Sequence, residues 1–262
     1  MKYLLAISLL CILAGCQKVI GIKLDSSETR YILTGKVTDQ PGGCQVSLTQ
    51  SKAFSENNQF PGIGGAKVSI DDNGIISVLT ESSAGVYTDS SLTGQPGHTY
   101  HLTVQTGSMT FTASSIMPQP VGLDSIYAKT SALSSGQYIT VVYKDPLHVA
   151  NYYHFIQYVN GRKEPSIFVS DDEFTDGITV RSQLNYNNDT NDPTRDIKVG
   201  DSVGIEMICN DAAVYQFWYS LSNGATGAGN SASPANPVSN IAGGAIGYFS
   251  AQTVRRRWLS VQ

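Results

Sequence analysis

The sequence predicts an all-β fold of two β-sandwich-like units with one short helix. Short stretches of alternating apolar and polar residues recur along the chain, as in strands that bury one face. Charged residues make up only 15% of the chain, whereas Thr, Ser, Gly, Asn, Tyr and Val are plentiful, which is typical of strands joined by turns. No helical periodicity separates the stretches, and this disfavours a parallel α/β sheet.

Residues 1–15 are predicted to be a lipoprotein signal peptide. Lys2 precedes an apolar run from Tyr3 to Ala14, which is too short for a bilayer that needs roughly 20 residues. The run ends in Leu-Ala-Gly followed by Cys16, small residues before a cysteine. Cleavage there would leave an acylated Cys16, and several acyl chains together anchor a protein durably. An ordinary secretory signal is the alternative.

Residues 16–30 are predicted to be the lipidated cysteine and a polar tether. Gln17 and Lys18 follow the cysteine, without the Asp that retains many Gram-negative lipoproteins at the inner membrane. We therefore expect lipid anchoring in the outer membrane, with the cell surface favoured and the leaflet open. Loss of Lys2 leaves 16 basic and 21 acidic residues, a net charge of −5, which argues against nucleic acid as a partner.

A first sandwich is predicted over residues 31–117. The segment Asn73-Gly74 lies between two apolar stretches and is a strong type I′ hairpin signal, since both of its residues need positive φ. About seven strands are expected, which suits a sandwich. They are Tyr31–Thr38, Gln45–Thr49, Gly64–Ile70, Ile75–Leu79, Ala84–Thr88, Thr99–Val104 and Met109–Ala113.

Two prolines in Met117–Pro120 mark the boundary, because proline removes backbone donors and stiffens the crossing. A second β-rich unit is predicted over residues 121–262. Asp211 is expected to cap a short helix that ends near Leu221, and Asn223–Pro237 is read as a long loop of small residues. The expected strands are Ser125–Lys129, Gln137–Tyr143, Tyr152–Val159, Ser166–Val169, Ile178–Ser182, Ser202–Cys209 and Ala245–Ala251.

Only Cys44 and Cys209 remain for an internal disulfide, because Cys11 leaves with the signal and Cys16 carries lipid. Cys209 ends an alternating stretch and is expected in a core, whereas Cys44 follows a turn-rich segment. The sequence leaves their pairing open and favours two free thiols.

Motifs for enzymatic chemistry are missing from the sequence. It contains no Gly-x-Ser-x-Gly, His-Glu-x-x-His or phosphate-binding glycine loop. His98 and His101 are three residues apart on an expected strand and should face opposite ways, and His148 and His154 have no third ligand at a recognisable spacing. We therefore expect a protein without catalytic residues or an obligatory cofactor.

Two polar segments are candidate contact sites. Asp171–Gly177 offers hard oxygen ligands at Asp171, Asp172 and Asp176, as calcium loops do, but lacks EF-hand spacing. A solvated turn is the favoured interpretation and calcium the weaker one. Asn185–Asp196 is read as an exposed loop, where binding function is often carried. Its candidate ligand or partner contacts are Asn188, Asp189 and Asp192.

Aromatic residues are further candidates. The stretch Tyr152–Tyr158 places aromatic side chains on both strand faces, so that the outward set, with Tyr153 as a candidate, could stack on a sugar or a partner. Packing in the core is the favoured interpretation. Arg255–Arg257 beside Trp258 is either a contact for anionic groups or a plain solvated strand.

Several segments carry a resemblance to known proteins. Gly35–Asp39, Gly65–Ile70, Gly85–Thr88 and Gly97–Val104 resemble the immunoglobulin-like or transthyretin-like modules of bacterial surface proteins. The order of these and further segments along the chain, from the Cys16 segment onward, resembles an uncharacterised lipoprotein family of Bacteroidota catalogued as domain of unknown function 4249. That order continues through Ser115–Pro118, Asp124–Ile126, Asn151–Phe155, Asp171–Gly177, Pro234–Ile241 and Gly243–Phe249.

The family resemblance implies a companion rather than a reaction, since such lipoproteins are similar in context to those encoded beside TonB-dependent outer-membrane receptors. We therefore expect a non-catalytic accessory or ligand-capturing subunit of a TonB-dependent transport complex. The all-β pattern departs from the helical lipoproteins that cap glycan importers of this kind. A free-standing surface adhesin or carbohydrate-binding module is the alternative.

Overall fold

A computed structural model describes residues 29–52, 60–130, 137–185, 195–224 and 236–262. The predicted signal peptide, Cys16, Asn188, Asp189 and Asp192 lie outside the described residues. Strands dominate the described chain, and α2 (Ala212–Gly224) is its one helix, so the predicted all-β class is confirmed. No helix in the described ranges is long and apolar enough to cross a membrane.

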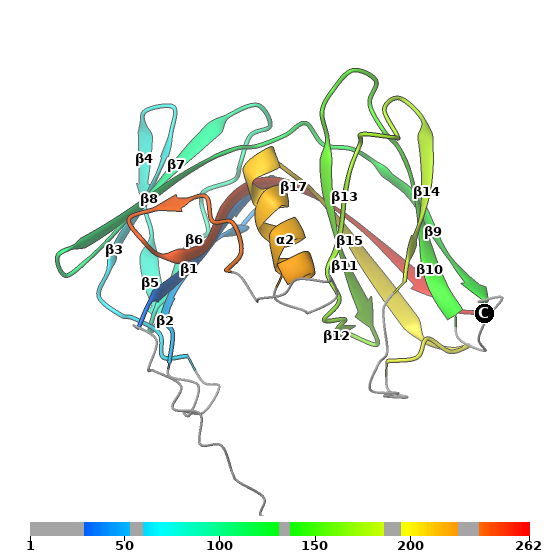
Figure 1. The fold of residues 1–262 in the computed structure, drawn as a ribbon, viewed down its shortest axis with the longest axis horizontal. Helices are drawn as coiled ribbons and strands as arrows, with labels where there is room; N and C mark the ends of the chain where they lie inside the picture. Colours follow the sequence, from blue (N-terminus) through cyan, green and yellow to red (C-terminus); the bar gives the residue numbers. More distant parts are fainter. Residues whose placement is uncertain (1–28, 53–59, 131–136, 186–194, 225–235) are drawn as a thin grey trace, which may run out of the picture.

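Three sheets form two adjoining units, with α2 lying between them (Figure 1). The largest sheet runs through both units, and β13 (Phe168–Asp171) also pairs with its strand β11. Its order is β12 (Arg162–Lys163), β11 (Tyr152–Val159), β15 (Ser202–Asn210), β17 (Ile246–Ser260), β1 (Tyr31–Thr38), β2 (Cys44–Gln50), β6 (Val86–Asp89) and β5 (Thr80–Ser83).

Each unit is completed by a smaller sheet that packs on one part of the large one. The first unit adds β16 (Ile241–Ala242), β8 (Met109–Ile116), β7 (Thr99–Thr106), β3 (Lys67–Asp72) and β4 (Ile75–Val78). The second unit adds β14 (Thr179–Leu184), β10 (Gln137–Lys144) and β9 (Leu123–Thr130). Apolar side chains from the facing sheets make two separate hydrophobic cores, one for each unit.

Strand β17 belongs to both units. Its first part pairs in parallel with β1, from Ile246 to Gln252, and its second part pairs antiparallel with β15, from Thr253 to Ser260. Asp39 lies at the changeover, where it accepts a hydrogen bond from the Val254 amide at 2.9 Å and pairs with Arg255 at 2.6 Å. A single continuous strand therefore joins the two sandwiches.

The first core draws on the end of the chain. Ile241, Ala245, Phe249 and Ala251 pack in that core with residues of β1–β8. The sequence-based boundary placed all of residues 121–262 in the second unit. These four side chains lie in the core of the first unit instead. Ala245, Phe249 and Ala251 lie in or directly before the part of β17 that pairs with β1, and Ile241 lies in β16, which pairs with β8.

Local features of the sequence gave accurate expectations. Asn73 and Gly74 have φ values of 51° and 90° and connect the paired residues Asp72 and Ile75, which confirms the type I′ hairpin. Asp211 caps α2 as predicted, because its Oδ1 accepts a hydrogen bond from the Val214 amide at 2.9 Å. Its Oδ2 accepts hydrogen bonds from the Ser115 hydroxyl and the Ile116 amide, which ties α2 to β8.

Cys44 and Cys209, the cysteines within the described ranges, are buried and free. Cys44 lies in the first core and Cys209 in the second, so the fold holds them in different units. Burial raises the pKa of the Cys44 thiol to about 12, and both thiols are therefore expected to be inert.

The close pairing of β1 with β17 makes Gly247 a sensitive position. Its φ is +134°, and a Cβ there would lie 1.9 Å from the Leu33 carbonyl oxygen. We expect Gly247→Ala to lower the free energy of unfolding by about 3 kcal/mol, because the ladder must open to admit the methyl group. Urea denaturation followed by circular dichroism measures this loss.

Gly244→Ala is the matched control. Gly244 also has positive φ, +90°, but no atom lies within 4 Å of its Cβ position, so a loss of only about 1 kcal/mol is expected from backbone strain. Equal losses for the two variants would show that the contact with Leu33 does not matter.

Candidate functional site

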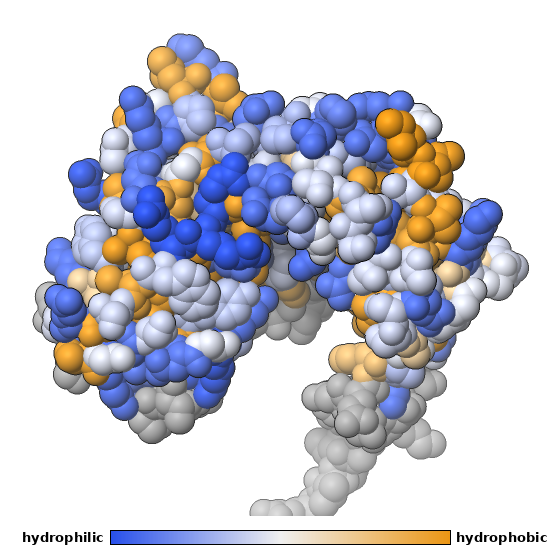
Figure 2. Space-filling view, turned by 180° about the vertical axis from the view of Figure 1, so that it is seen from behind, coloured by the Kyte–Doolittle hydropathy of each residue, from blue (hydrophilic) through white to orange (hydrophobic). Residues whose placement is uncertain are grey.

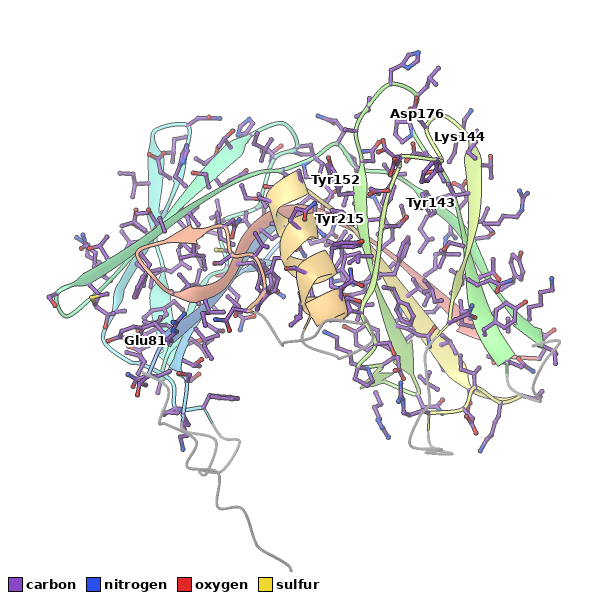
Figure 3. All side chains as sticks on the ribbon, viewed as in Figure 1. Glu81, Tyr143, Lys144, Tyr152, Asp176 and Tyr215 are labelled. Carbon is purple, nitrogen blue, oxygen red and sulfur yellow. The ribbon has the colours of Figure 1, made fainter. Side chains whose placement is uncertain are left out.

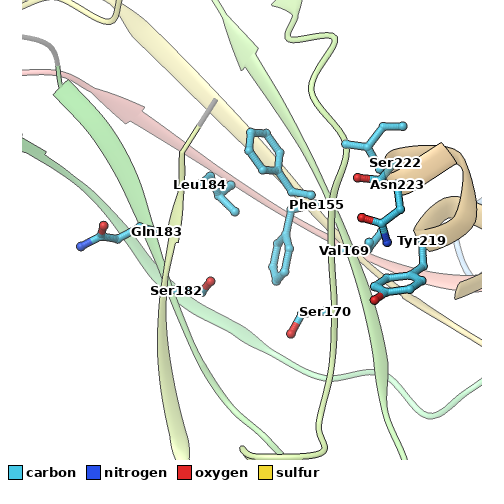
Figure 4. Close-up of a pocket in the computed structure, with 11 residues that line it drawn as sticks. Phe155, Val169, Ser170, Ser182, Gln183, Leu184, Tyr219, Ser222 and Asn223 are labelled. Carbon is cyan, nitrogen blue, oxygen red and sulfur yellow. The ribbon is translucent and has the colours of Figure 1, made fainter. Parts of the chain in front are cut away.

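A pocket of about 240 Å³ opens between the edges of two sheets in the second unit (Figure 4). Strand β13 is paired with β11 and β14 is paired with β10, so the pocket occupies the space between the two edges. The lining residues are Phe155, Ile167, Phe168, Val169, Ser170, Ser182, Gln183, Leu184, Tyr219, Ser222 and Asn223.

The pocket has an apolar floor and a polar rim. Phe155 and Leu184 belong to the second core and form the floor. Figure 4 shows Ser170 and Ser182 on opposite walls, while the neighbouring Gln183 side chain points away. Its volume falls below the roughly 300–1,000 Å³ of a pocket for a drug-sized ligand. The site therefore suits one small amphipathic group, such as a sugar ring or an inserted side chain.

Helix α2 supplies the third wall through an aromatic row. The Tyr215 ring lies 5.1 Å from Tyr152 and 5.6 Å from Tyr219, and the Tyr215 hydroxyl donates to Asp171 at 3.1 Å. Burial and this hydrogen bond raise the pKa of Tyr215 to about 12. A second hollow borders Asp171, Tyr215 and Tyr219. The half-exposed Tyr219 thus lines both hollows.

A second aromatic group fixes α2 to the sheet. Trp218 packs 4.4 Å from the His154 ring and 5.1 Å from Tyr248, ring centre to ring centre, and so bridges β11 and β17. His154 is 6% exposed. Burial, with a smaller contribution from Lys163, lowers the pKa of His154 to about 4. The imidazole is therefore neutral at pH 7.

An acidic cluster lies in the same unit. Within the described ranges, Asp145, Asp172 and Asp176 each place a carboxylate oxygen within 4.8 Å of the others. The sequence predicted Asp172 and Asp176 as partners but grouped them with Asp171. Asp171 instead accepts the hydrogen bond from Tyr215, because β13 ends there and turns the next residues toward the end of β10.

Tyr153 is not a surface contact, in contrast to the sequence-based prediction. It is fully buried in the second core, because it shares the inward face of β11 with Phe155. Its hydroxyl donates to Asp145 Oδ1, so Tyr153 supports the acidic cluster from below. Burial and this bond raise its pKa.

The C-terminal aromatic candidate is exposed but lies outside the pocket lining. Trp258 is 62% exposed, and its ring covers Gly204, where a Cβ would approach it to 2.4 Å. The neighbouring arginines have protein partners: Arg255 pairs with Asp39, Arg256 with Glu206, and Arg257 donates to the Leu123 carbonyl. The three arginines belong to β17, and their side-chain contacts attach this strand to neighbouring segments.

Sequence reasoning missed the pocket and Asp145. Asp145 follows a predicted strand and precedes Pro146, which is an ordinary polar strand end. The Asp145 amide donates a hydrogen bond to the Ile178 carbonyl at 3.0 Å, next to the β10–β14 pairing. This pairing brings Asp145 beside the turn after β13. The sequence places Ser182 at the end of one predicted strand and Ser170 directly after another, and this pattern does not reveal a pocket.

A family model described as Domain of unknown function (DUF4249) matches residues 18–257. The match covers both units and every residue of the pocket and of the acidic cluster. Comparison with curated proteins finds no match to the chain.

The buried His154 predicts a pH-dependent stability. Its folded-state pKa of about 4 lies below the ordinary histidine pKa of 6.5, so the unfolded chain takes up the proton first. This contribution to stability is complete above pH 6.5 and is lost as the pH falls toward 4, by about 3 kcal/mol in all. Urea denaturation between pH 7.5 and 4 measures it.

His154→Phe should remove that part of the pH dependence, since phenylalanine keeps the ring contact with Trp218 without a titrating group. His101→Phe is the matched control, because it makes the same substitution at an exposed position outside the aromatic group of α2. Identical pH profiles for the wild type and His154→Phe would refute the assignment.

Proposed function

The chain belongs to the DUF4249 family, and on that premise we propose that it is a non-catalytic outer-membrane lipoprotein that serves a TonB-dependent transport complex as an accessory or ligand-capturing subunit. In this proposal the acylated Cys16 anchors the chain, with the cell surface as the favoured side. The second unit makes the contact with ligand or receptor around the pocket.

The pocket between β13 and β14 is the observation that carries the proposal. Its walls lead directly into the three segments in which the sequence places recognition. Asp171–Gly177 follows β13, Asn185–Asp196 follows β14, and Asn223–Pro237 begins at the pocket residue Asn223. Loops at the end of a rigid sandwich commonly carry binding function.

The arrangement of the units suits a tethered binder. The described chain enters the first unit at β1, while the pocket lies in the second unit, on the other side of α2 (Figure 1). A lipid anchor confines such a module to the plane of a receptor and raises its effective concentration, so that an interface of modest affinity suffices.

A free-standing adhesin or carbohydrate-binding module is the second candidate. Tyr219 at the pocket rim is 48% exposed and Trp258 is 62% exposed, and exposed aromatic rings are suitable platforms for sugars. In this case the protein would bind glycans without any stoichiometric membrane partner.

The decisive experiment is purification of the tagged full-length protein from outer membranes in mild detergent. Recovery of one large receptor in a stoichiometric amount is the expected result, and Cys16→Ala, which cannot be acylated, should lose it. Recovery of the protein alone from intact membranes would contradict the transport role and direct attention to glycan binding.

A pocket variant tests the site itself. Ser182→Trp places a large ring between the two walls, and we expect recovery of the receptor to fall at least about tenfold, equivalent to 1.4 kcal/mol of binding free energy. Arg181→Trp is the matched control, since Arg181 does not line the pocket and its exposed side chain leaves the same strand on the opposite face from Ser182. Equal recovery with both variants would place the contact elsewhere.

A further inference from the structure

We propose that Asp145, Asp172 and Asp176 form a calcium site at the tip of the second unit, with Asn151 and Thr175 as neighbouring oxygen donors. Asp145 directly follows β10, and the other two carboxylates lie in the turn that follows β13. Figure 3 shows Asp176 in the connection at this end of the unit. The site is separate from the pocket, and its existence does not depend on the proposed transport role.

Backbone and tyrosine donors hold the three carboxylates in place. The Tyr153 hydroxyl donates to Asp145, the Asn151 amide donates to Asp172 Oδ2 at 2.9 Å, and the His148 amide donates to Asp176 Oδ1 at 2.6 Å. Each donor therefore fixes one oxygen of a carboxylate and preorganises the cluster.

The charges of the cluster are poorly balanced by protein groups. The one ion pair described for these carboxylates joins Asp176 to His148 Nδ1 at 3.5 Å, and His148 is highly exposed. Lys144 is adjacent in sequence but forms no ion pair with the cluster in the described structure. Three carboxylates this close repel one another unless a cation or proton intervenes.

Buried oxygens without partners provide independent support for a ligand. Asp145 is fully buried, and its Oδ2 has no hydrogen-bond partner in the described structure. The same holds for Oδ1 of Asn151, which is 2% exposed, and for Oγ1 of Thr175. A buried carboxylate oxygen without a partner is costly. This oxygen belongs to a carboxylate of the cluster, and a cation bound by that carboxylate would offset the cost of its burial.

Calcium fits the donor set best. Carboxylate, amide and hydroxyl oxygens are hard ligands, and calcium accepts six to eight of them at about 2.3–2.6 Å in flexible geometry. Oxygens bound to one such ion lie no more than about 5 Å apart, and one oxygen from each of the three carboxylates lies within 4.8 Å of the others. Magnesium demands a stricter octahedron and gives up water reluctantly.

The site would join the β10–β11 connection to the β13–β14 connection, and both contain exposed apolar residues. Leu147 and Val149 follow Asp145, and Phe174 lies between Asp172 and Asp176, with exposed fractions of 61%, 46% and 85%. Figure 2 shows apolar surface at this tip of the second unit. Bound calcium would hold both connections in one arrangement and set the positions of these three side chains.

Isothermal titration calorimetry of the full-length protein, purified in detergent and treated with EDTA, tests the site with calcium chloride. We expect saturable binding and a rise of a few degrees in Tm at a calcium concentration well above Kd. Asp172→Asn should weaken binding at least about tenfold, because it removes one charge from a half-buried position. Magnesium chloride should bind more weakly.

Asp171→Asn is the matched control, since Asp171 adjoins the cluster but bonds to Tyr215, and it should bind calcium like the wild type. Variant folding is checked by Tm in EDTA. Absence of heat and of a Tm shift at about 10 mM calcium, above the range of extracellular calcium modules, would overturn the site. Equal calcium affinity of folded Asp172→Asn and the wild type would overturn it as well.

Discussion

The continuity of β17 is the constraint on which both units depend. A strand of 15 residues completes a parallel ladder with β1 and then an antiparallel ladder with β15. Because its side chains enter the first core, that core closes only when the end of the chain arrives. Helix α2 packs on the same strand through Tyr248, so the wall of the pocket is positioned by β17 too.

Much of the fold followed from short-range patterns. Strands β1 and β11 begin and end where alternation predicts, and Asn73-Gly74 makes its hairpin, because neighbouring residues determine these features. Strands β12 and β16 were missed because two residues show no period, and β5 was missed because Thr80–Ser83 is entirely polar and exposed. Strand β17 continues to Ser260, so the strand predicted to end at Ala251 and the solvated strand considered for Arg255–Arg257 are parts of one strand. Arg255–Arg257 obscured the alternation there, and their partners lie on distant segments.

The candidate sites were harder to predict because each combines segments that only tertiary pairing brings together. Asp172 and Asp176 were recognised as oxygen ligands from composition, yet Asp145 comes from a different strand. Tyr153 was considered as an exposed aromatic contact, but its side chain lies on the buried face of β11. Alternation alone does not fix the face, since a one-residue shift in strand phase exchanges core and surface. The pocket arises from two sheet edges that remain unjoined, which alternation along either strand cannot reveal.

The parallel pairing of β1 and β17 also has a mechanical consequence. A pull on the chain before β1, opposed by the second unit through the far end of β17, would load the ladder from Ile32–Ile246 to Thr38–Gln252 along its length. The hydrogen bonds would then share the force in shear instead of opening one after another. We expect the first unit to resist such a pull better than the β7–β8 hairpin resists being peeled from its ends. Single-molecule force spectroscopy with both attachment geometries would compare the two, and equal rupture forces would contradict this expectation.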